Sequence, residues 1–269
     1  MTFLRRPLPR PGLLLLLAFS LAIPACATRP NPSDPEAVAE FRQVNDPVEP
    51  LNRGMYFIND GLDTLVLRPA AEAYRIFIPP EVRTGVRNVL GNLRTPVILA
   101  NDLLQGQTQR AGETIGRFVL NTTLGIGGIF DVATGFGLPG HGEDFGQTLA
   151  TWGVSEGPYL FIPVLGPSNP RDLAGVGVDF AANPLTWLTG NEAFDALTNT
   201  RIVLQGLDTR EGLIEPLDAL RRGSLDPYAA LRSAYRQRRA AEIGNTLGAS
   251  SPAARGTGFG IGAGFEGLR

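Results

Sequence analysis

Apolar residues recur at helical spacing in two stretches of the chain. The first stripe starts after Asp46, with successive steps of 4, 3, 4 and 3 residues: Leu51, Met55, Ile58, Leu62 and Leu65. The second follows the helix-stopping pair Pro79-Pro80: Val82, Val86, Val89, Leu90, Leu93 and Val97. Residues at these steps share one face of an α-helix. Such a face ordinarily packs into a core, so we expect both stripes to be buried.

The remaining pattern is also helical. We expect helices around residues 102–121, 171–188 and 226–243, further helix within 190–222, and a short helix starting near Asp34. The chain shows no sustained alternation of apolar and polar residues, which would indicate strands. The fold class is therefore predicted to be mainly α. No segment after the N-terminal region has the roughly 20 apolar residues of a membrane-spanning helix.

Two segments are more apolar than an amphipathic helix or a solvated loop. Residues 118–140 carry one formal charge, Asp131, among glycines and bulky apolar residues, and residues 159–167 (YLFIPVLGP) are almost continuously apolar. Surface of this kind faces either a core or lipid. The residues alone leave both interpretations open.

The N-terminus has the parts of a secretory signal peptide. Arg5, Arg6 and Arg10 precede an uncharged run over residues 12–23, and the small residue Ala25 ends the region. This order is typical of a segment that is removed on export. We therefore predict that the mature protein starts after residue 25.

The single cysteine of the chain, Cys26, follows directly. Residues 23–26, I-P-A-C, resemble the lipobox at which bacterial lipoproteins are cleaved and diacylated, although Pro24 is unusual in that pattern. Acyl chains on Cys26 would anchor the protein to a membrane without a spanning helix. Ala27 at the next position implies sorting to the outer membrane. The alternative is ordinary cleavage, which leaves an unpaired thiol.

Composition divides the mature chain into three parts. We expect residues 26–45 to form a Pro-rich tether, residues 46–243 to form one helical domain, and the Gly/Ala/Ser-rich residues 244–269 to be a disordered tail. Without the three arginines of the signal peptide, 21 arginines and 26 acidic residues give a net charge near −5. This balance argues against a nucleic-acid partner.

The pentapeptide GVSEG, residues 153–157, matches the G-x-S-x-G pattern that seats the nucleophilic serine of many lipases and esterases. That elbow needs a strand before the serine, a helix after it and a histidine later in the chain. Here Pro158 and an apolar run follow Ser155, and the sole histidine, His141, precedes it. The residues favour a glycine-bracketed turn. A nucleophilic serine stays open, because other folds order their triads differently.

No metal, nucleotide or other cofactor is expected. Glu143 and Asp144 follow His141 closely, but a metal site needs three or four ligands, and the chain has no second histidine and no spare cysteine. A turn in which Asp144 caps the following helix fits this segment better. The run Gly125-Ile126-Gly127-Gly128 lacks the third glycine of a nucleotide-binding loop, because Phe130 takes that position.

Five separated blocks of the chain resemble one protein family. They are NDPVEPLNRGMYFIN (45–59), RTPVILANDLLQG (94–106), FVLNTTLGIGGIFDVAT (118–134), EDFGQTLATWGVSEGPYLFIPVLGPSNPRD (143–172) and LDPYAALRSAYRQRR (225–239). Together with Cys26, they make the chain similar to the MlaA/VacJ family of outer-membrane lipoproteins over residues 45–240.

The resemblance implies a ring-shaped single domain of amphipathic helices that lies in the inner leaflet of the outer membrane. An amphipathic channel would run through its centre, with an apolar, glycine-rich helical hairpin beside it. The implied function is removal of mislocalised phospholipids from the outer leaflet, which maintains lipid asymmetry. The implied partners are phospholipids, a trimeric porin and a periplasmic phospholipid carrier, and no catalytic step is implied.

The resemblance also implies two site segments. Residues Leu120 to Val132 match a hairpin that gates the channel in the family, with Gly125, Gly127 and Gly128 as its bend. The triplet Leu51-Asn52-Arg53 matches a segment whose integrity affects the state of that channel. Two other functions stay open. One is a serine-dependent envelope phospholipase that uses Ser155, and the other is a lipoprotein that scaffolds the envelope without transporting lipid.

Overall fold

The computed structural model describes residues 31, 33–187 and 191–245. The predicted signal peptide, the lipidation site Cys26 and the tail beyond residue 245 lie outside these residues. The assignment of residues 26–45 to a tether and of 46–243 to one domain therefore stays a prediction.

The described chain is mainly helical, which confirms the predicted fold class. Its elements are α2 (Pro35–Val44), α3 (Glu49–Leu62), the π-helix η1 (Asp63–Leu67), α4 (Arg68–Phe77), α5 (Pro80–Leu104), α6 (Thr108–Thr123), α7 (Val132–Gly135), α8 (Phe145–Thr151), β1 (Leu160–Ile162), β2 (Gly166–Ser168), α9 (Pro170–Ala182), the 3₁₀-helix η2 (Pro184–Trp187), α10 (Glu192–Gly212), α11 (Ile214–Gly223) and α12 (Pro227–Ile243). Two short antiparallel strands form a hairpin inside the apolar segment 159–167 and its flank.

The helix expected around residues 102–121 is divided in two. The first part, which α5 contains, stops at Leu104, and Gly106 takes a left-handed φ of +74°. A glycine in this conformation is a common way to end a helix, because it carries no Cβ to clash with the last turn. The chain then reverses into α6, so α5 and α6 form a helical hairpin.

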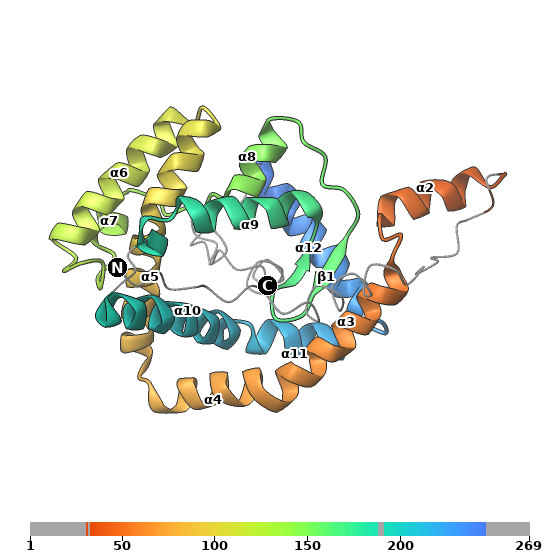
Figure 1. The fold of residues 1–269 in the computed structure, drawn as a ribbon, viewed down its shortest axis with the longest axis horizontal. Coiled ribbons are helices and arrows are strands. Elements are labelled where there is room, and N and C mark those ends of the chain that lie inside the picture. The colour runs from red at the N-terminus through yellow and green to blue at the C-terminus, as the bar shows by residue number, and fades with distance from the viewer. Residues whose placement is uncertain (1–30, 32, 188–190, 246–269) are drawn as a thin grey trace, which may run out of the picture.

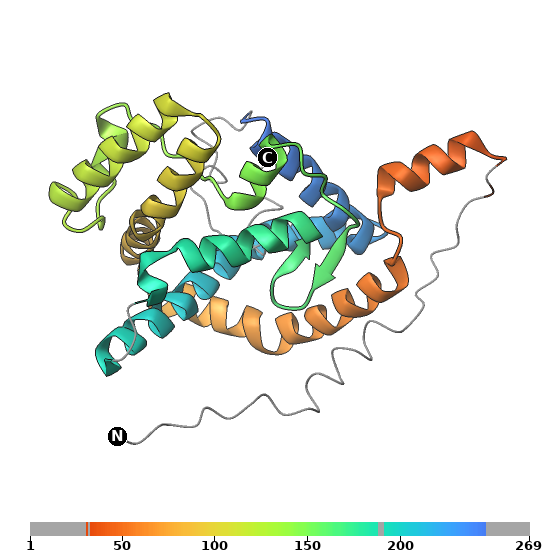
Figure 2. The ribbon, with the colours of Figure 1, turned by 45° about the horizontal axis from the view of Figure 1, so that its top comes forward.

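The helices follow a course around the periphery of the molecule (Figure 1). Along one long edge, α3, η1 and α4 form a curved rod, and α5 turns away from its end. The helices α10 and α11 return beside this rod, and α8, α9 and α12 form the part that faces it (Figure 2). The hairpin α5–α6 stands at one side of the molecule, and the strands β1 and β2 lie at the other side.

The main apolar cluster is small and aromatic. It is built from Tyr159, Phe161, Leu213, Tyr228, Leu231 and Tyr235. Tyr56 of α3 packs edge-to-face on Phe161 and Tyr228, with ring centroids 5.6 and 5.8 Å apart. Edge-to-face pairs are favourable beyond the area they bury. This cluster joins α3, the β hairpin and α12, and so closes one side of the molecule.

The expectation that the first apolar stripe is buried holds only at its start, where Met55 packs against the aromatic cluster. Ile58 is 56% exposed and Leu65 is 78% exposed, while Asn52 and Asp63 on the other side of the same rod are 2% and 4% exposed. In the second stripe only the far end behaves as predicted, since Val82 is exposed and Val97 is buried. The periodicity located the helices correctly but did not predict which of their side chains are buried.

Polar side chains dominate the interior instead. Among the described residues, buried polar and charged side chains outnumber buried apolar ones. Many of them form ion pairs between helices, such as Asp63 with Arg210 and Asp208 with Arg87. Within the part of the chain that the structure describes, no helix is both long and apolar enough to cross a bilayer.

Candidate functional site

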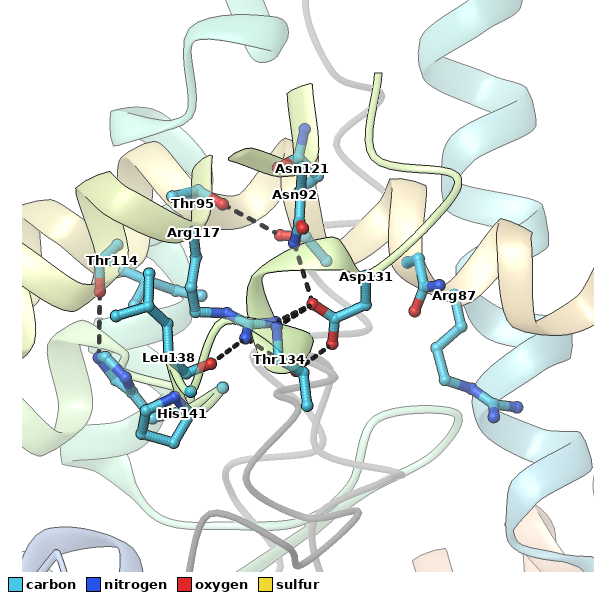
Figure 3. Close-up of a pocket in the computed structure, with 16 residues that line it drawn as sticks. Arg87, Asn92, Thr95, Thr114, Arg117, Asn121, Asp131, Thr134, Leu138 and His141 are labelled. Atoms are coloured by element: carbon cyan, nitrogen blue, oxygen red, sulfur yellow. Dashed lines mark hydrogen bonds and ion pairs between the residues drawn. The ribbon is translucent and has the colours of Figure 1, made fainter. Parts of the chain in front are cut away.

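A polar pocket of about 420 Å³ lies between α5, α6 and the segment that follows them (Figure 3). We call it the α5–α6 pocket. Its polar lining residues are Arg87, Asn88, Asn92 and Thr95 from α5, Thr114, Arg117 and Asn121 from α6, and Asp131, Thr134 and His141 from the segment beyond. Small-molecule sites in proteins span roughly 300–1,000 Å³, so this pocket is large enough for a small polar group.

The wall on α5 consists of residues at helical spacing. Asn88, Asn92 and Thr95 share a face with Gly91, and Gly91 adds no side chain to the pocket. The Asn88 amide donates to the carbonyl of Ile129 at 3.0 Å, and the Asn92 amide donates to the hydroxyl of Thr122 at 3.0 Å. Asn88 therefore ties α5 to residues 124–130, which we call the glycine-rich turn, and Asn92 ties α5 to the end of α6.

The opposite wall is fixed by one ion pair. Arg117 of α6 donates to Asp131 Oδ1 at 2.9 Å and to the carbonyl of Leu138 at 2.6 Å. Asp131 also accepts from Asn121 and from the hydroxyl of Thr134. Burial alone would raise the pKa of Asp131, but the hydrogen bonds from Thr134, Arg117 and Asn121 hold it below its usual range. Asp131 is therefore anionic at neutral pH.

His141 lies at the end of the pocket without forming a catalytic triad. Its Nε2 contacts Asp102 at 3.0 and 3.1 Å and the hydroxyl of Thr114 at 3.2 Å. Thr114 in turn donates to Asp102 at 2.6 Å. In a triad the histidine accepts the proton of the nucleophile through one nitrogen and contacts the carboxylate through the other. Here one nitrogen meets both partners, which makes this a structural network.

The segment after His141 is the predicted turn and helix cap. The carboxylate of Asp144 accepts from the backbone N–H of Gln147 at 2.9 Å, which caps α8 as expected. Glu143 is almost fully buried beside Gln105 and Arg110, and burial raises its pKa to about 7. Across the described ranges, no group of three or more His, Cys, Asp or Glu side chains is arranged to hold a metal ion.

The glycines of the expected gating segment lie in the turn between α6 and α7. Leu120 belongs to the last turn of α6 and Val132 begins α7, so Gly125, Gly127 and Gly128 connect these two helices. The bend between α5 and α6 is a separate one, at Gly106. The gating role of this segment stays a prediction.

The glycine-rich turn folds back onto the end of α6. The N–H of Gly127 donates to the backbone carbonyl of Thr122 at 2.9 Å, and the N–H of Gly128 donates to the backbone carbonyl of Asn121 at 2.8 Å. Ile126, Gly127 and Gly128 all have positive φ, of 53°, 69° and 95°. A β-branched residue in this region is an outlier. Ile126 nevertheless points outward, 64% exposed, so the turn presents an apolar tip.

Ser155 lies in an exposed loop between α8 and β1. The order is helix, serine, strand, which is the reverse of the nucleophile elbow. The flanking glycines, Gly153 and Gly157, both have positive φ, as a tight turn requires. His141 makes its hydrogen bonds to Asp102 and Thr114 rather than to Ser155. Ser155 therefore lies in an irregular segment between two glycines of positive φ.

The triplet Leu51-Asn52-Arg53 connects α3 to the β hairpin and α12. The Asn52 amide donates to Asp46 at 2.7 Å and to the carbonyl of Tyr159 at 2.9 Å, and its oxygen accepts from the N–H of Phe161 at 2.9 Å. Arg53 pairs with Asp226 and lies 4.5 Å from the ring centroid of Tyr228. Leu51 is half-buried. Two of the three residues therefore tie distant segments together.

Substituting Asn52→Ala is expected to lower the free energy of unfolding by about 2 kcal/mol, because it leaves the buried N–H of Phe161 and the carbonyl of Tyr159 without their partner. Urea unfolding followed by near-UV circular dichroism measures this. Exposed Asn199 of α10 offers the matched control, and Asn199→Ala is expected to change stability by less than about 0.5 kcal/mol. Equal stability of the two variants would contradict the role assigned to Asn52.

Sequence reasoning missed most of the pocket. Asn88, Asn92, Thr95 and Arg117 were not singled out, although the first three fall at helical spacing between the apolar positions of α5. That polar stripe was the available signal. The partner wall comes from residues between Thr114 and His141, which only the folded chain brings next to α5.

The fold and the pocket together define a mainly helical protein with outward apolar side chains and a polar pocket between helices. The chain belongs to the MlaA lipoprotein family, whose model matches residues 44–242. It is similar to the intermembrane phospholipid transport system lipoprotein MlaA of Escherichia coli strain K12, with 39% identity over 199 residues, 72% of this chain and 76% of the relative.

Two further comparisons agree with this assignment. The MlaA protein of Haemophilus influenzae is 32% identical over 230 residues, which cover 84% of this chain and 87% of the relative. A solved structure described as the structural basis for maintenance of bacterial outer membrane lipid asymmetry matches with a TM-score of 0.64 and 36% identity, over 74% of this chain and 98% of that one. The family resemblance expected from the sequence is thereby confirmed.

Proposed function

We infer that this chain is an outer-membrane lipoprotein that removes mislocalised phospholipids from the outer leaflet and passes them to a periplasmic carrier. The observation that carries the proposal is the reversed polarity of the molecule: Leu65, Ile76 and Phe77 are more than three-quarters exposed along the α3–α4 rod, while the interior is polar. A phospholipid has a charged head and apolar tails, so its path needs both kinds of surface.

The exposed apolar rod supports embedding in a single leaflet. The side chains involved lie on α3, η1 and α4, and more are exposed on α6 and the glycine-rich turn after it. An amphipathic helix that lies in the membrane plane buries one apolar face among the acyl chains. Acylated Cys26 would keep the protein at the inner leaflet, from which these faces insert.

A trimeric porin and a soluble periplasmic carrier are the partners that this function needs. The porin would hold the lipoprotein across the leaflet boundary, and the carrier would receive lipid on the periplasmic side. The glycine-rich turn between Leu120 and Val132 would gate the path, and the Leu51-Asn52-Arg53 segment would stabilise the side of the ring that Asn52 closes.

Complementation of a deletion strain tests transport against catalysis. The strain expresses either the natural chain or the Ser155→Ala variant at equal levels, and outer-leaflet phospholipid is measured. We expect both to restore lipid asymmetry fully, because Ser155 lies in an exposed loop. Restoration by the natural chain alone, with the variant still folded, would instead support a serine-dependent phospholipase. Failure of both would overturn the transport proposal and favour a scaffold.

A further inference from the structure

Two residues that line the α5–α6 pocket, Asn88 and Asn92, have side-chain amide oxygens that accept no hydrogen bond from another described residue. The side-chain amides of Asn88 and Asn92 use their nitrogens to hold the glycine-rich turn. Among the described residues, no donor reaches either amide oxygen, and both side chains line the pocket. An acceptor that faces an internal surface calls for a donor from a ligand or from water.

The charges around the pocket have opposite signs at separate places. Arg87 lies on one side (Figure 3), with 37% of its side chain exposed and its guanidinium directed to Asp208 of α10. Asp131 lies between Arg87 and Arg117 in the view of Figure 3 and keeps 27% of its side chain exposed. The positive charge of Arg117 is paired with the negative charge of Asp131. Arg87 also lies 3.6 Å from a carboxylate oxygen of Glu211, so both cations of the lining have anionic partners and the lining has no large excess of either sign.

We propose that the α5–α6 pocket binds a phosphoethanolamine group, with its phosphate on the side of Arg87 and its ammonium against the amide oxygens of Asn88 and Asn92. The ligand is then the headgroup of a phosphatidylethanolamine. This proposal rests on the phospholipid transport proposed above, and it names the headgroup that the site prefers.

The chemistry of the lining favours this zwitterion over a purely anionic headgroup. An ammonium carries three N–H donors and no acceptor, and so it matches a wall of unpaired amide oxygens. The four hydrogen bonds that Asp131 already accepts leave it as a nearby negative charge rather than as a direct ligand. A phosphatidylglycerol headgroup would place its single net negative charge in the same field without an ammonium to offset it.

Binding of soluble short-chain lipids to the purified full chain in detergent tests the proposal. Dihexanoyl phosphatidylethanolamine and dihexanoyl phosphatidylglycerol have the same tails, so the ratio of their dissociation constants reports the headgroup alone. We expect phosphatidylethanolamine to bind about fivefold more tightly. Asn88→Asp, which adds a negative charge beside the ammonium, is expected to raise this ratio about fivefold, and Asn88→Lys is expected to reverse it.

The control variant is Asn199→Asp, which makes the same chemical change at an exposed position of α10 and is expected to leave the ratio unchanged. Melting curves establish that each variant is folded. Equal binding of the two lipids by the natural chain, or a ratio that Asn88→Asp and Asn88→Lys do not move, would overturn the headgroup preference. Complementation by the natural chain would then still support transport, so the two proposals fail separately.

A competition arm identifies the source of the group. Free O-phosphoethanolamine is expected to displace the short-chain phosphatidylethanolamine at higher concentration, and glycerol 3-phosphate is not. Displacement by both compounds alike would overturn recognition of the ammonium. Binding of free O-phosphoethanolamine without binding of the lipid would overturn the assignment of the ligand as a lipid headgroup.

Discussion

Replacing Gly128 by alanine is expected to lower the free energy of unfolding by about 3–4 kcal/mol. Gly128 has a φ of +95°, where an L-residue is strained, and a Cβ at this position would lie 2.6 Å from the Cβ of Asn92. Backbone strain of this kind costs about 1–3 kcal/mol, and overpacking costs about as much again. The clash is with α5, so the turn must move away from Asn92 or the helix must shift.

Gly127 provides the matched control. Its φ is also positive, at +69°, but a Cβ there would meet nothing within 4 Å. Gly127→Ala therefore carries the strain without the clash, and we expect a loss of about 1 kcal/mol. Urea unfolding of both variants in detergent, followed by the fluorescence of the two tryptophans, gives the comparison. If the two variants are equally stable, the turn is not packed against α5 in the way described.

The sequence predicted where helices form better than which side they bury. The spacing of Leu51, Ile58 and Leu65 located the α3–α4 rod, yet the polar residues Asn52 and Asp63 are among those that it buries. Periodicity reports that a helix has two unlike faces, and it does not report what surrounds the protein. The same pattern would fit a soluble bundle. The proposed embedding of this rod in lipid accounts for the exposure of Leu65 and Phe77.

The sequence correctly predicted features that depend only on residues close together in the chain. Asp144 caps α8 through the N–H of Gln147, three residues away, and the glycines around Ser155 both have positive φ. The α5–α6 pocket could not be predicted in this way. Its walls depend on Asn92 meeting Thr122 and on Arg117 meeting Leu138, contacts that span 30 and 21 residues.

Asn92 connects the two halves of the proposed function. Its amide nitrogen reaches the hydroxyl of Thr122 and the carbonyl of Gly127, and its side chain lines the pocket. The gate implied by the family resemblance and the headgroup site therefore share one side chain. A group bound in the pocket would act on the residue that holds the glycine-rich turn, because the two amide ends cannot move independently.

Replacing Arg239 by methionine is expected to destabilise the protein by about 3–5 kcal/mol at pH 7. Arg239 of α12 is 7% exposed. It donates to both oxygens of Asp144 at 2.7 Å, to Asp172 at 2.8 Å and to Glu242 at 3.0 Å. Removing one partner of a buried ion pair leaves an uncompensated charge, which costs about this much. Here three carboxylates lose their common cation.

The pH dependence of the free energy of unfolding distinguishes the loss of the ion pairs of Arg239 from a simple loss of packing. Burial alone would raise the pKa of Asp144 and of Asp172, but Arg239 holds both below their usual range. The stability they contribute is fully present above the unfolded pKa of about 3.9 and is lost as the pH falls below it. In the variant, both folded pKa values rise, so acid relieves the buried charge.

We therefore expect the difference in stability between the natural chain and Arg239→Met to be largest near pH 7 and to shrink as the pH falls through the raised folded pKa values of the variant. Trp152 packs on Phe145, next to Asp144, with ring centroids 5.8 Å apart, so its fluorescence reports unfolding at this place. Exposed Arg222 of α11 is the control position, and Arg222→Met is expected to cost less than about 0.5 kcal/mol. A pH-independent loss in Arg239→Met would mean that its methylene packing, rather than its charge, joins α12 to α8 and α9.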